Sequence, residues 1–285
     1  MITALLRQSV LPLFPELDSP WRFLRPKTLD IGSFRRKVAV DFTVRDYQVK
    51  TVESPSELKQ ILGLRRSVFH YEFARKWISF KSDFDSFDLV GDHLAIFDRK
   101  AGKVAGVYRL IPSSASRRFY SSTEFDLGTF LDTPGTKLEL SRACINREYR
   151  NGIVIGLLWK GLAEYAKAAG ADYLFGLSSI NTVEELEIAG IHKWFETRGL
   201  ISDEYGIAPK APYRIDDFGK YYAAVPAPKD DAAAAVPSLF KTYLKAGAKV
   251  CSQPVIDRDF HCADWLTVLD MRGLASSFDR KFMKD

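Results

Sequence analysis

The most regular pattern of hydrophobic and polar positions lies in the middle of the chain, at residues 138–169. Residues 138–145 are mostly apolar or compatible with a β-strand, and only Glu139 and Arg142 interrupt this run. A helical stripe of apolar side chains follows at Val154, Leu158, Leu162, Tyr165 and Ala169. The pattern therefore predicts a buried central strand, a short turn and an amphipathic helix.

Similar patterns predict elements on both sides of this unit. Upstream, we expect a strand at 37–49, a helix from Ser54 or Ser56 to about residue 73, and a hairpin formed by 93–98 and 103–111. Downstream, we expect helices at 181–198 and 238–246 and strands at 171–178, 219–225, 249–252 and 263–270. Residues 226–237, rich in proline and alanine, are the segment most typical of a linker.

The turn between the central strand and its helix carries Arg147 and Arg150 and ends in Asn151-Gly152. Asn151 is a suitable N-cap, and Gly152 lets a ligand approach the first helical turn closely. The free N–H groups of the helix start, the positive end of the helix dipole and the two arginines together predict a seat for a phosphate. From the sequence alone, an ordinary turn with solvated arginines explains these residues equally well.

Composition narrows the class of protein. The chain has 285 residues, of which 46% are hydrophobic and 27% charged, and its net charge is +5. These values are typical of a folded protein, and the modest positive charge favours an acidic partner or an anionic membrane surface rather than nucleic acid. The three cysteines have no paired spacing, which indicates reduced thiols in a cytosolic protein, and the four histidines have no metal-ligand spacing, so no metal is expected.

The sequence offers no candidate for a membrane-spanning helix. Its longest unbroken apolar run, at residues 152–159, is about eight residues long, far shorter than a span requires. Residues 1–15 place apolar side chains on one face of a candidate amphipathic helix, which could pack on the protein or contact a membrane surface.

Several short motifs resemble those of bacterial acyltransferases. The Arg-Asn-Gly turn at residues 147–154 resembles the pyrophosphate loop of GNAT acyltransferases, although that loop is usually richer in glycine. The run Glu139-Leu140-Ser141-Arg142 is similar to the Glu-x-Ser-Arg of acyl-homoserine lactone synthases and of ornithine-lipid N-acyltransferases. Four further segments resemble motifs of these groups: residues 64–69 (LRRSVF), 87–94 (FDLVGDHL), 107–112 (VYRLIP) and 119–127 (FYSSTEFDL).

Residues 236–271 favour one of the two groups. They contain a Tyr-Leu-x-x-Gly-Ala helix end, a Cys-x-x-Pro strand, an Asp-x-Asp-Phe run and an Ala-Asp pair before the last strand. This order resembles the C-terminal signature of ornithine-lipid N-acyltransferases, which acyl-homoserine lactone synthases lack. The resemblance extends from about residue 64 to the C-terminus.

The resemblance implies an α+β fold, a three-layer α/β/α sandwich. Its GNAT-like central sheet should be mixed and mainly antiparallel, with splayed central strands and flanking helices. The chain then divides into an N-terminal extension (1–36), the acyltransferase core (37–225) and a C-terminal segment that completes the fold (226–285). Strands 138–145 and 173–178 should be neighbours that splay apart, with the helix from Asn151 starting in the gap.

The implied reaction is N-acyl transfer. We expect an enzyme that moves a 3-hydroxyacyl chain from acyl carrier protein to the α-amine of ornithine or a similar amino acid, in ornithine-type lipid biosynthesis. The co-substrate is an acyl-phosphopantetheine thioester, on acyl carrier protein or on CoA, and no cofactor is bound permanently. The alternatives are an acyl-homoserine lactone-type synthase and a non-catalytic module that binds acyl groups or carrier protein. The expected location is the cytoplasm, with peripheral contact at the inner face of the membrane left open.

The resemblance also assigns roles to individual residues. The predicted catalytic residues are Glu139, Arg142, Asp88 and Asp92. The predicted substrate-binding residues are Arg65, Phe69, His93 and Arg109. The predicted donor-binding residues are Arg147, Arg150, Asn151, Gly152 and Ile153. A docking face for an acidic carrier is predicted from Arg65, Arg66, Arg117, Arg118, Arg147 and Arg150.

Some of these roles depend on geometry that the sequence leaves open. In a regular strand Glu139 and Arg142 point to opposite faces, so they converge only across a β-bulge, and Arg142 could instead pair with Asp88 or Asp92. Burial should raise the pKa of Glu139, while a nearby arginine should lower it, and Glu139 could simply complete a buried ion pair. Arg109 could hold a ligand or a core carboxylate, and the acidic loop 82–93 could be solvated or bind a cation.

Overall fold

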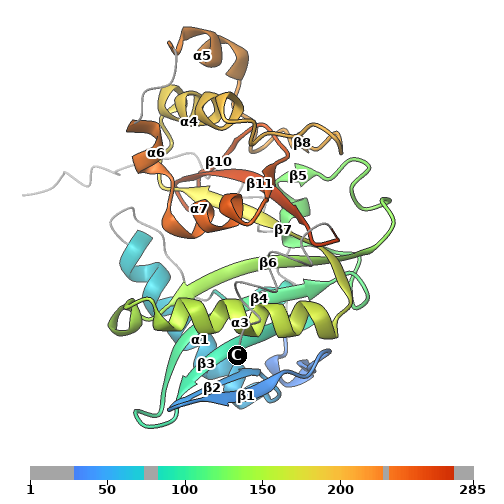
Figure 1. Ribbon diagram of the computed structural model, residues 1–285, viewed down its shortest axis with the longest axis vertical. Coiled ribbons are helices and arrows are strands. Elements are labelled where there is room, and N and C mark those ends of the chain that lie inside the picture. Colours follow the sequence, from blue (N-terminus) through green and yellow to red (C-terminus); the bar gives the residue numbers. More distant parts are fainter. Residues whose placement is uncertain (1–28, 74–82, 227–230, 273–285) are drawn as a thin grey trace, which may run out of the picture.

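A computed structural model of the chain describes residues 29–73, 83–226 and 231–272, and nine strands of this part form one large mixed sheet (Figure 1). Its strands lie in the order β1-β2-β3-β4-β6-β7-β11-β10, and β9 also pairs with β11. Every pair is antiparallel except β6 with β7, which are parallel. The strands are β1 (Asp41–Val44), β2 (Tyr47–Thr51), β3 (Asp92–Asp98), β4 (Lys103–Pro112), β6 (Thr136–Ile145), β7 (Ala171–Ile180), β9 (Lys249–Val250), β10 (Val255–Asp257) and β11 (Cys262–Asp270). A separate two-stranded sheet joins β5 (Phe125–Asp126) to β8 (Ala208–Pro209).

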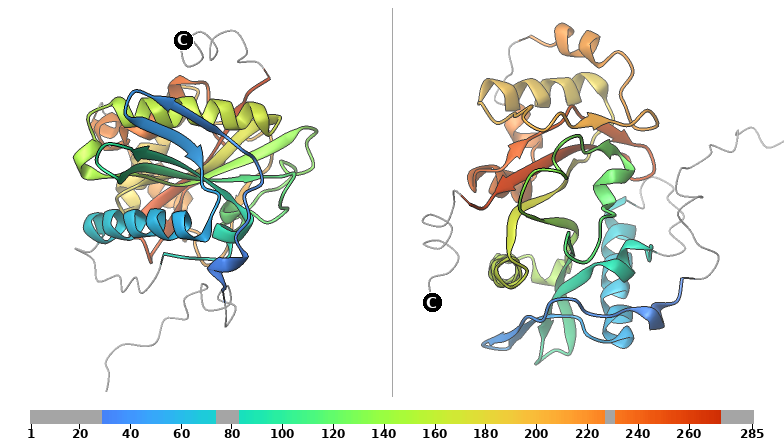
Figure 2. Two further views of the ribbon diagram at one scale, coloured as in Figure 1. Left: turned by 90° about the horizontal axis from the view of Figure 1, so that it is seen from below. Right: turned by 90° about the vertical axis from the view of Figure 1, so that its right-hand side faces the viewer.

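Helices cover both faces of the sheet. In the views of Figure 2, α1 and α3 lie on opposite sides of the first strands, and α4 and α7 lie over the C-terminal half. The helices are α1 (Pro55–Phe73), α2 (Phe87–Val90), α3 (Ile153–Ala168), α4 (Glu185–Thr197), α5 (Phe218–Ala224), α6 (Asp231–Ala235) and α7 (Ser238–Lys245). The chain thus has the predicted α+β fold, with a mainly antiparallel sheet between helical layers.

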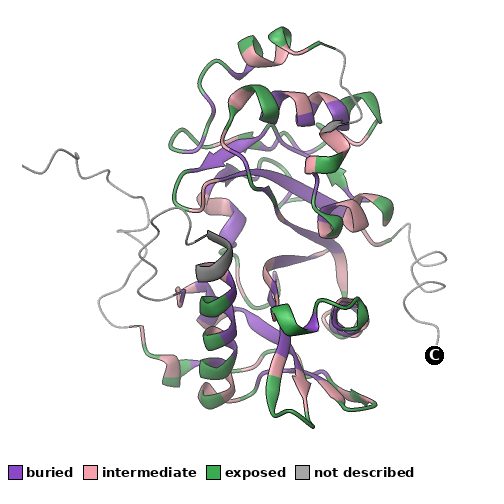
Figure 3. Ribbon diagram, turned by 90° about the vertical axis from the view of Figure 1, so that its left-hand side faces the viewer, coloured by how far each residue is buried: buried purple, intermediate pink, exposed green. Residues whose placement is uncertain are grey.

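The central helix α3 forms because its apolar stripe has a sheet face to cover. Val154, Leu158, Leu162 and Tyr165 are at most 1% exposed, and they join the core that α3 shares with β2, β3, β4 and β6. In Figure 3 the central strands are buried, whereas the outward side of α1 is exposed. The stripe read from the sequence is therefore the face that fixes α3 to the sheet.

The N-terminal strand prediction needs a correction. Residues 37–49 do not form one strand: β1 and β2 form a hairpin in which Val44 faces Tyr47 across a two-residue turn. Arg45 in this turn has a positive φ of 53°. The alternation of apolar and polar residues continues through the turn, and so the pattern by itself did not reveal the reversal.

The C-terminal third contains two further corrections. Residues 219–225 were predicted as a strand, but 219–224 lie in helix α5, because Phe218 and Tyr222, one helical turn apart, both pack on His192 of α4. The linker predicted at 226–237 contains helix α6, whose alanines pack into the same core as α4. Strand β10 was not predicted, since three residues are too few to show a period.

Two sequence predictions concern the membrane. The candidate amphipathic helix at residues 1–15 lies outside the described residues. Among the helices in the described ranges, none is long and apolar enough to cross a membrane.

Candidate active site

The two central strands diverge and leave a cavity between them. The parallel ladder of β6 and β7 ends at the pair Glu139–Phe175, as the prediction of splayed strands required. Gly176 stands at the point of divergence: a Cβ atom there would lie 2.2 Å from the carbonyl oxygen of Leu140, so only glycine fits. Beyond it opens a cavity of about 310 Å³, lined on its two sides by residues 140–143 of β6 and 177–179 of β7.

Helix α7 packs beside the sheet and forms one wall of the cavity. Its Tyr243 contacts the Tyr108 hydroxyl of β4 and packs edge-on against Trp159 of α3, with ring centroids 5.3 Å apart. Helix α3 itself begins over β4 rather than in the gap, because Val154 and Leu158 pack against Gly106. The C-terminal segment therefore supplies a wall of the cavity that α3 does not.

A β-bulge in β6 turns Arg142 toward the same face as Glu139. Val107 of β4 faces Cys144 and Arg109 faces Ser141, so two residues of β6 stand opposite one of β4. Arg142 in the bulge has a φ of 53°. Its guanidinium lies 4.5 Å from the ring centroid of Tyr120, and Glu139 binds the backbone of Tyr120. The bulge thus brings both side chains to one residue.

Glu139 holds a turn of the backbone. Its two carboxylate oxygens accept hydrogen bonds from the N–H groups of Tyr120 (2.7 Å) and Ser121 (2.6 Å), in the short 3-10 helix Tyr120–Thr123. The side chain is fully buried and does not line the cavity. Burial raises its pKa above the usual range, while these hydrogen bonds and Arg109 act in the opposite direction, as expected from the sequence.

Three arginines and three aspartates form a buried ionic network behind Glu139. Arg65 of α1 contacts Asp83 and Asp88, and its side chain is completely buried. Arg109 of β4 contacts Asp85 at 2.8 Å and Asp88 at 3.1 Å. Arg142 reaches Asp83 at 3.2 Å and Asp85 at 3.5 Å, rather than Asp88 or Asp92 as considered from the sequence.

This network explains the acidic loop. Each aspartate is matched by an arginine of the same chain, so the cations that the loop binds belong to the protein itself. Although burial opposes ionisation, the two nearest arginines hold the pKa of Asp88 well below its usual value. Arg109 has core carboxylates as partners, and the completely buried Arg65 cannot belong to a docking face, which corrects that prediction.

His93 and Asp92 are buried neighbours in β3 that contact different parts of the protein. His93 is fully buried, its Nε2 lies 3.0 Å from the backbone oxygen of Asp88, and burial lowers its pKa to about 4, so the ring is neutral near pH 7. Asp92 accepts hydrogen bonds from the backbone N–H groups of Lys37 and Val38 and from the Tyr165 hydroxyl. Neither side chain lines the cavity.

The residues predicted to bind a phosphate lie at the outer end of β6. Arg147, Arg150, Asn151, Gly152 and Ile153 are all exposed, and none of them lines the cavity. Gly152 is the N-cap with a φ of 88°, and the Asn151 side chain accepts the N–H of Ile153 at 3.1 Å. Of the other predicted site residues, only Phe69 and Arg142 border the cavity.

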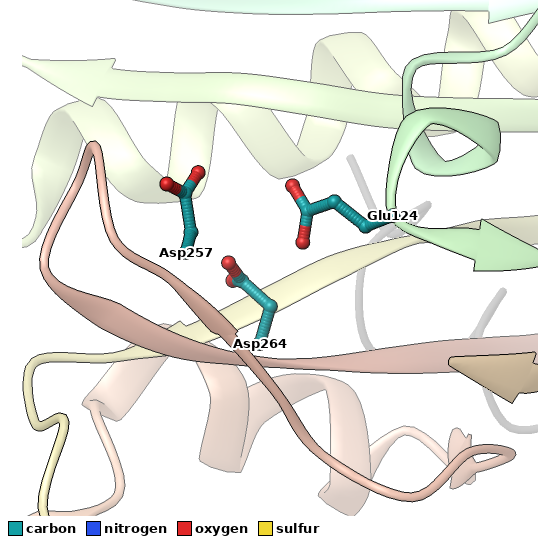
Figure 4. Close-up of side chains that lie close together, drawn as sticks. All are labelled: Glu124, Asp257 and Asp264. Carbon is teal, nitrogen blue, oxygen red and sulfur yellow. The ribbon is translucent and has the colours of Figure 1, made fainter. Parts of the chain in front are cut away.

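The cavity is lined by a group of carboxylates that is separate from the ionic network and that the sequence did not predict. Glu124, Asp257 and Asp264 are each at most 3% exposed, and ligand oxygens from the three lie within 4.8 Å of one another. Figure 4 shows them pointing toward a common centre from three separate segments. The sequence did carry a signal, because these residues belong to the Phe-Tyr and C-terminal motifs noted above, but their separation along the chain hid the cluster.

Comparisons with known proteins show which proteins the chain is similar to. Residues 64–160 match the family model of the acetyltransferase (GNAT) domain. The chain is 30% identical to an L-ornithine N(alpha)-acyltransferase of Rhizobium meliloti (strain 1021), over 82% of this chain and 83% of that protein. It is 31% identical to a protein of the same name from Agrobacterium fabrum (strain C58), over 70% of each. Among solved structures, a CoA-dependent acyl-homoserine lactone synthase matches with a TM-score of 0.44 at 14% identity, over 81% of this chain and 89% of that one.

Proposed function

Because this chain belongs to the L-ornithine N(alpha)-acyltransferase family and is therefore an acyltransferase, we propose that it transfers a 3-hydroxyacyl group from acyl carrier protein to the α-amine of ornithine or a similar amino acid. The observation that carries this proposal is the cavity between β6 and β7. It combines an unpaired strand edge, the arginine of the β6 bulge and a group of carboxylates. These are the elements needed to receive a thioester and a cationic amino acid.

The diverging strands suit the acyl donor. Since the β6–β7 ladder ends at Glu139, backbone N–H groups of β6 beyond it can donate to the oxyanion that forms on the thioester carbonyl. We place the phosphate of the phosphopantetheine arm at the start of α3, near Arg147, Arg150, Asn151, Gly152 and Ile153, where free N–H groups and the helix dipole favour an anion. The exposure of this turn is compatible with a donor that arrives on a carrier protein.

The chemistry requires a neutral amine. Its nitrogen attacks the thioester carbonyl carbon, and the C–S bond breaks. The nitrogen then loses a proton and the released thiolate gains one, so that the products are an amide and a thiol. Glu139 remains our candidate for a base or a positioning carboxylate. Arg142 and the buried Asp88 and Asp92 remain the other candidate catalytic residues. The contacts of Glu139 with the 3-10 helix support the positioning role, because both of its oxygens already accept hydrogen bonds.

Product analysis tests the proposal. Lipids from cells that express the protein should contain an N-acylated amino acid that is absent from cells with an empty vector, as measured by mass spectrometry. In vitro, the purified protein should release thiol from 3-hydroxyacyl carrier protein only when ornithine is present. Formation of an acyl-homoserine lactone, or thiol release that needs no amino acid, would refute the proposal, and a parallel reaction with the acyl-CoA of equal length identifies the preferred donor.

A further inference from the structure

The three carboxylates in the cavity come from segments far apart in the chain. Glu124 precedes β5, Asp257 ends β10 and Asp264 lies in β11 (Figure 4). All three line the cavity between β6 and β7, and one oxygen from each lies within 4.8 Å of the other two. Three buried carboxylates at this separation repel one another strongly unless protons or a cation neutralise them.

Glu124 shows that the cluster lacks a partner. Its side chain is 0% exposed, and neither of its carboxylate oxygens receives a hydrogen bond from the described residues. Buried carboxylates are otherwise almost always hydrogen-bonded. Its neighbours differ: Asp257 accepts the backbone N–H groups of Asp259 and Phe260, and Asp264 accepts the Ser179 hydroxyl. The unpaired oxygens therefore point to a ligand with hydrogen-bond donors.

The protein does not itself neutralise the cluster. Arg142 is the arginine close enough to act on Glu124 and Asp264, but it already contacts Asp83 and Asp85 in the ionic network. Glu139 adds further negative charge near Glu124. Burial raises the pKa of all three carboxyl groups, and repulsion by neighbouring carboxylates adds to this effect at Glu124 and at Asp257, whose pKa rises to about 7. A cationic ligand would relieve this repulsion and leave all three groups ionised.

The chemistry of the reaction selects the kind of cation. A primary ammonium group has three N–H donors, which matches three carboxylates around one point. The reacting α-amine must be neutral, however, and a cluster of carboxylates would hold it in its protonated form. The cluster therefore suits an ammonium group that does not react.

We propose that Glu124, Asp257 and Asp264 bind the side-chain ammonium of the acceptor, and that they select amino acids with a second amine. This inference rests on the proposed function and adds to it the residues that recognise the distal end of the acceptor. Arg142 also lines this cavity, so the acceptor carboxylate can approach its guanidinium. The α-amine would then face the strand edge of β6.

The test compares ornithine with norvaline, which has the same carbon chain without the distal amine. Wild-type enzyme should show a kcat/KM for ornithine about 10³-fold above that for norvaline, because a site built for a donor discriminates strongly against its absence. Glu124→Gln should lower kcat/KM for ornithine about 10²-fold, mainly through KM, and change that for norvaline by less than about threefold. The matched control is Asp126→Asn, which alters an exposed carboxylate two residues away and should change neither value.

Binding without chemistry gives a second measurement. Ornithine alone should raise the Tm of the wild-type protein and not that of Glu124→Gln, and norvaline should raise neither. The variant by itself should not have a lowered Tm, because neither oxygen of the Glu124 carboxyl group accepts a hydrogen bond from the described residues. These Tm shifts show whether the three carboxylates bind the distal ammonium group, even if transfer to norvaline is too slow to measure.

Several results would overturn the inference. An equal loss of activity with both acceptors would place the cluster at the α-amine, and an unchanged ratio would show that it does not contact the acceptor. Loss of activity with a chelator, restored by Mg²⁺ or Ca²⁺, would make the cluster a metal site instead. If wild-type enzyme acylates ornithine and norvaline equally well, only this inference fails, whereas transfer to no amino acid at all would refute the proposed function.

Discussion

The side chains around the cavity divide into two charge environments. In the ionic network, Arg65, Arg109 and Arg142 balance three aspartates, and ionised groups are stabilised although they are buried. In the cavity, Glu124 and its two neighbours share negative charge without comparable compensation. The first environment stabilises the fold, and the second is available for a ligand.

Glu139→Gln separates catalysis from structure. The two carboxylate oxygens of Glu139 each accept one backbone N–H, but the amide of glutamine has only one oxygen. Its NH₂ group cannot accept the second N–H, so one hydrogen bond to Tyr120 or Ser121 is lost. We expect a free energy of unfolding lowered by about 1–3 kcal/mol and a kcat reduced no more than about tenfold. A fall in kcat of about 10²–10⁴ with an unchanged Tm would instead identify Glu139 as the base. Thermal melts and steady-state kinetics on the same preparations provide the comparison.

Asp257 gives the ligand-free protein a distinctive pH dependence. Its folded pKa of about 7 lies above the ordinary value of 3.8, so between these limits the folded state holds a proton that the unfolded state has lost. The contribution of this group to stability therefore falls as pH rises from about 4 to about 7. Asp257→Asn, which does not titrate, should become more stable relative to wild type over this range, by no more than about 4 kcal/mol. Urea unfolding at pH 5 and pH 7.5 measures the difference, and a constant difference would contradict it.

Secondary-structure elements create the cavity through two local irregularities of the central strands. The bulge in β6 reorients Arg142, and Gly176 in β7 permits the close approach to Leu140 after which the strands separate. Helix α7 then covers the opening and is tied to β4 and α3 through Tyr243. The cavity is thus a consequence of strand geometry, closed by a segment from the C-terminal part of the chain.

Gly176→Ala should disturb this geometry. The new methyl group would meet the backbone oxygen of Leu140, which cannot rotate away as a flexible side chain can. We expect the free energy of unfolding to fall by about 1–3 kcal/mol, together with a loss of acyl transfer. The matched control is Gly63→Ala in α1, where no atom lies within 4 Å of the new Cβ and helix propensity should add up to about 1 kcal/mol. Equal stability of the two variants would show that the strand contact is not limiting.

One sheet joins the N-terminal and the C-terminal parts of the described chain. Strand β11, from the C-terminal region, pairs with β7 along eight residues and supplies Asp264 to the cavity. The exposed arginines of the predicted docking face lie on α1, after β4 and after β6. In our proposal, the acceptor binds in the buried cavity and the carrier protein approaches these exposed arginines.

Charge reversal on this exterior tests the proposed carrier. Surface charges steer association and are screened by salt, so activity with acyl carrier protein should fall severalfold between low and moderate ionic strength. Arg147→Glu combined with Arg150→Glu should raise KM for the carrier about tenfold or more, and Arg117→Glu with Arg118→Glu, the other exposed pair of the predicted docking face, should raise it as well. An uncharged acyl-pantetheine donor is the control, since its KM should not respond to salt. Salt-independent activity with acyl carrier protein would remove the docking proposal.

Local patterns in the sequence determined the order of most elements and the residues of the central strand–turn–helix. Apolar runs and helical spacing identify β3, β4, β6, α1 and α3 directly, because the helices each bury one face and the strands are largely buried. The short motifs, through their resemblance to known acyltransferases, also led to the family and to the residues of the ionic network. Where the period is ambiguous, as across the β1–β2 turn or in the aromatic run of α5, the pattern was insufficient.

Only the tertiary structure decided which charges are compensated. From the sequence, the carboxylates of the acidic loop were the natural candidates for binding a cation, yet arginines from α1, β4 and β6 already pair with them. Glu124, Asp257 and Asp264 are separated by up to 140 residues of chain, and they meet because β11 inserts beside β7 and faces the turn that follows β4. A carboxylate's role depends on burial and on the charges around it, and those neighbours are set by long-range strand pairing that no local pattern encodes.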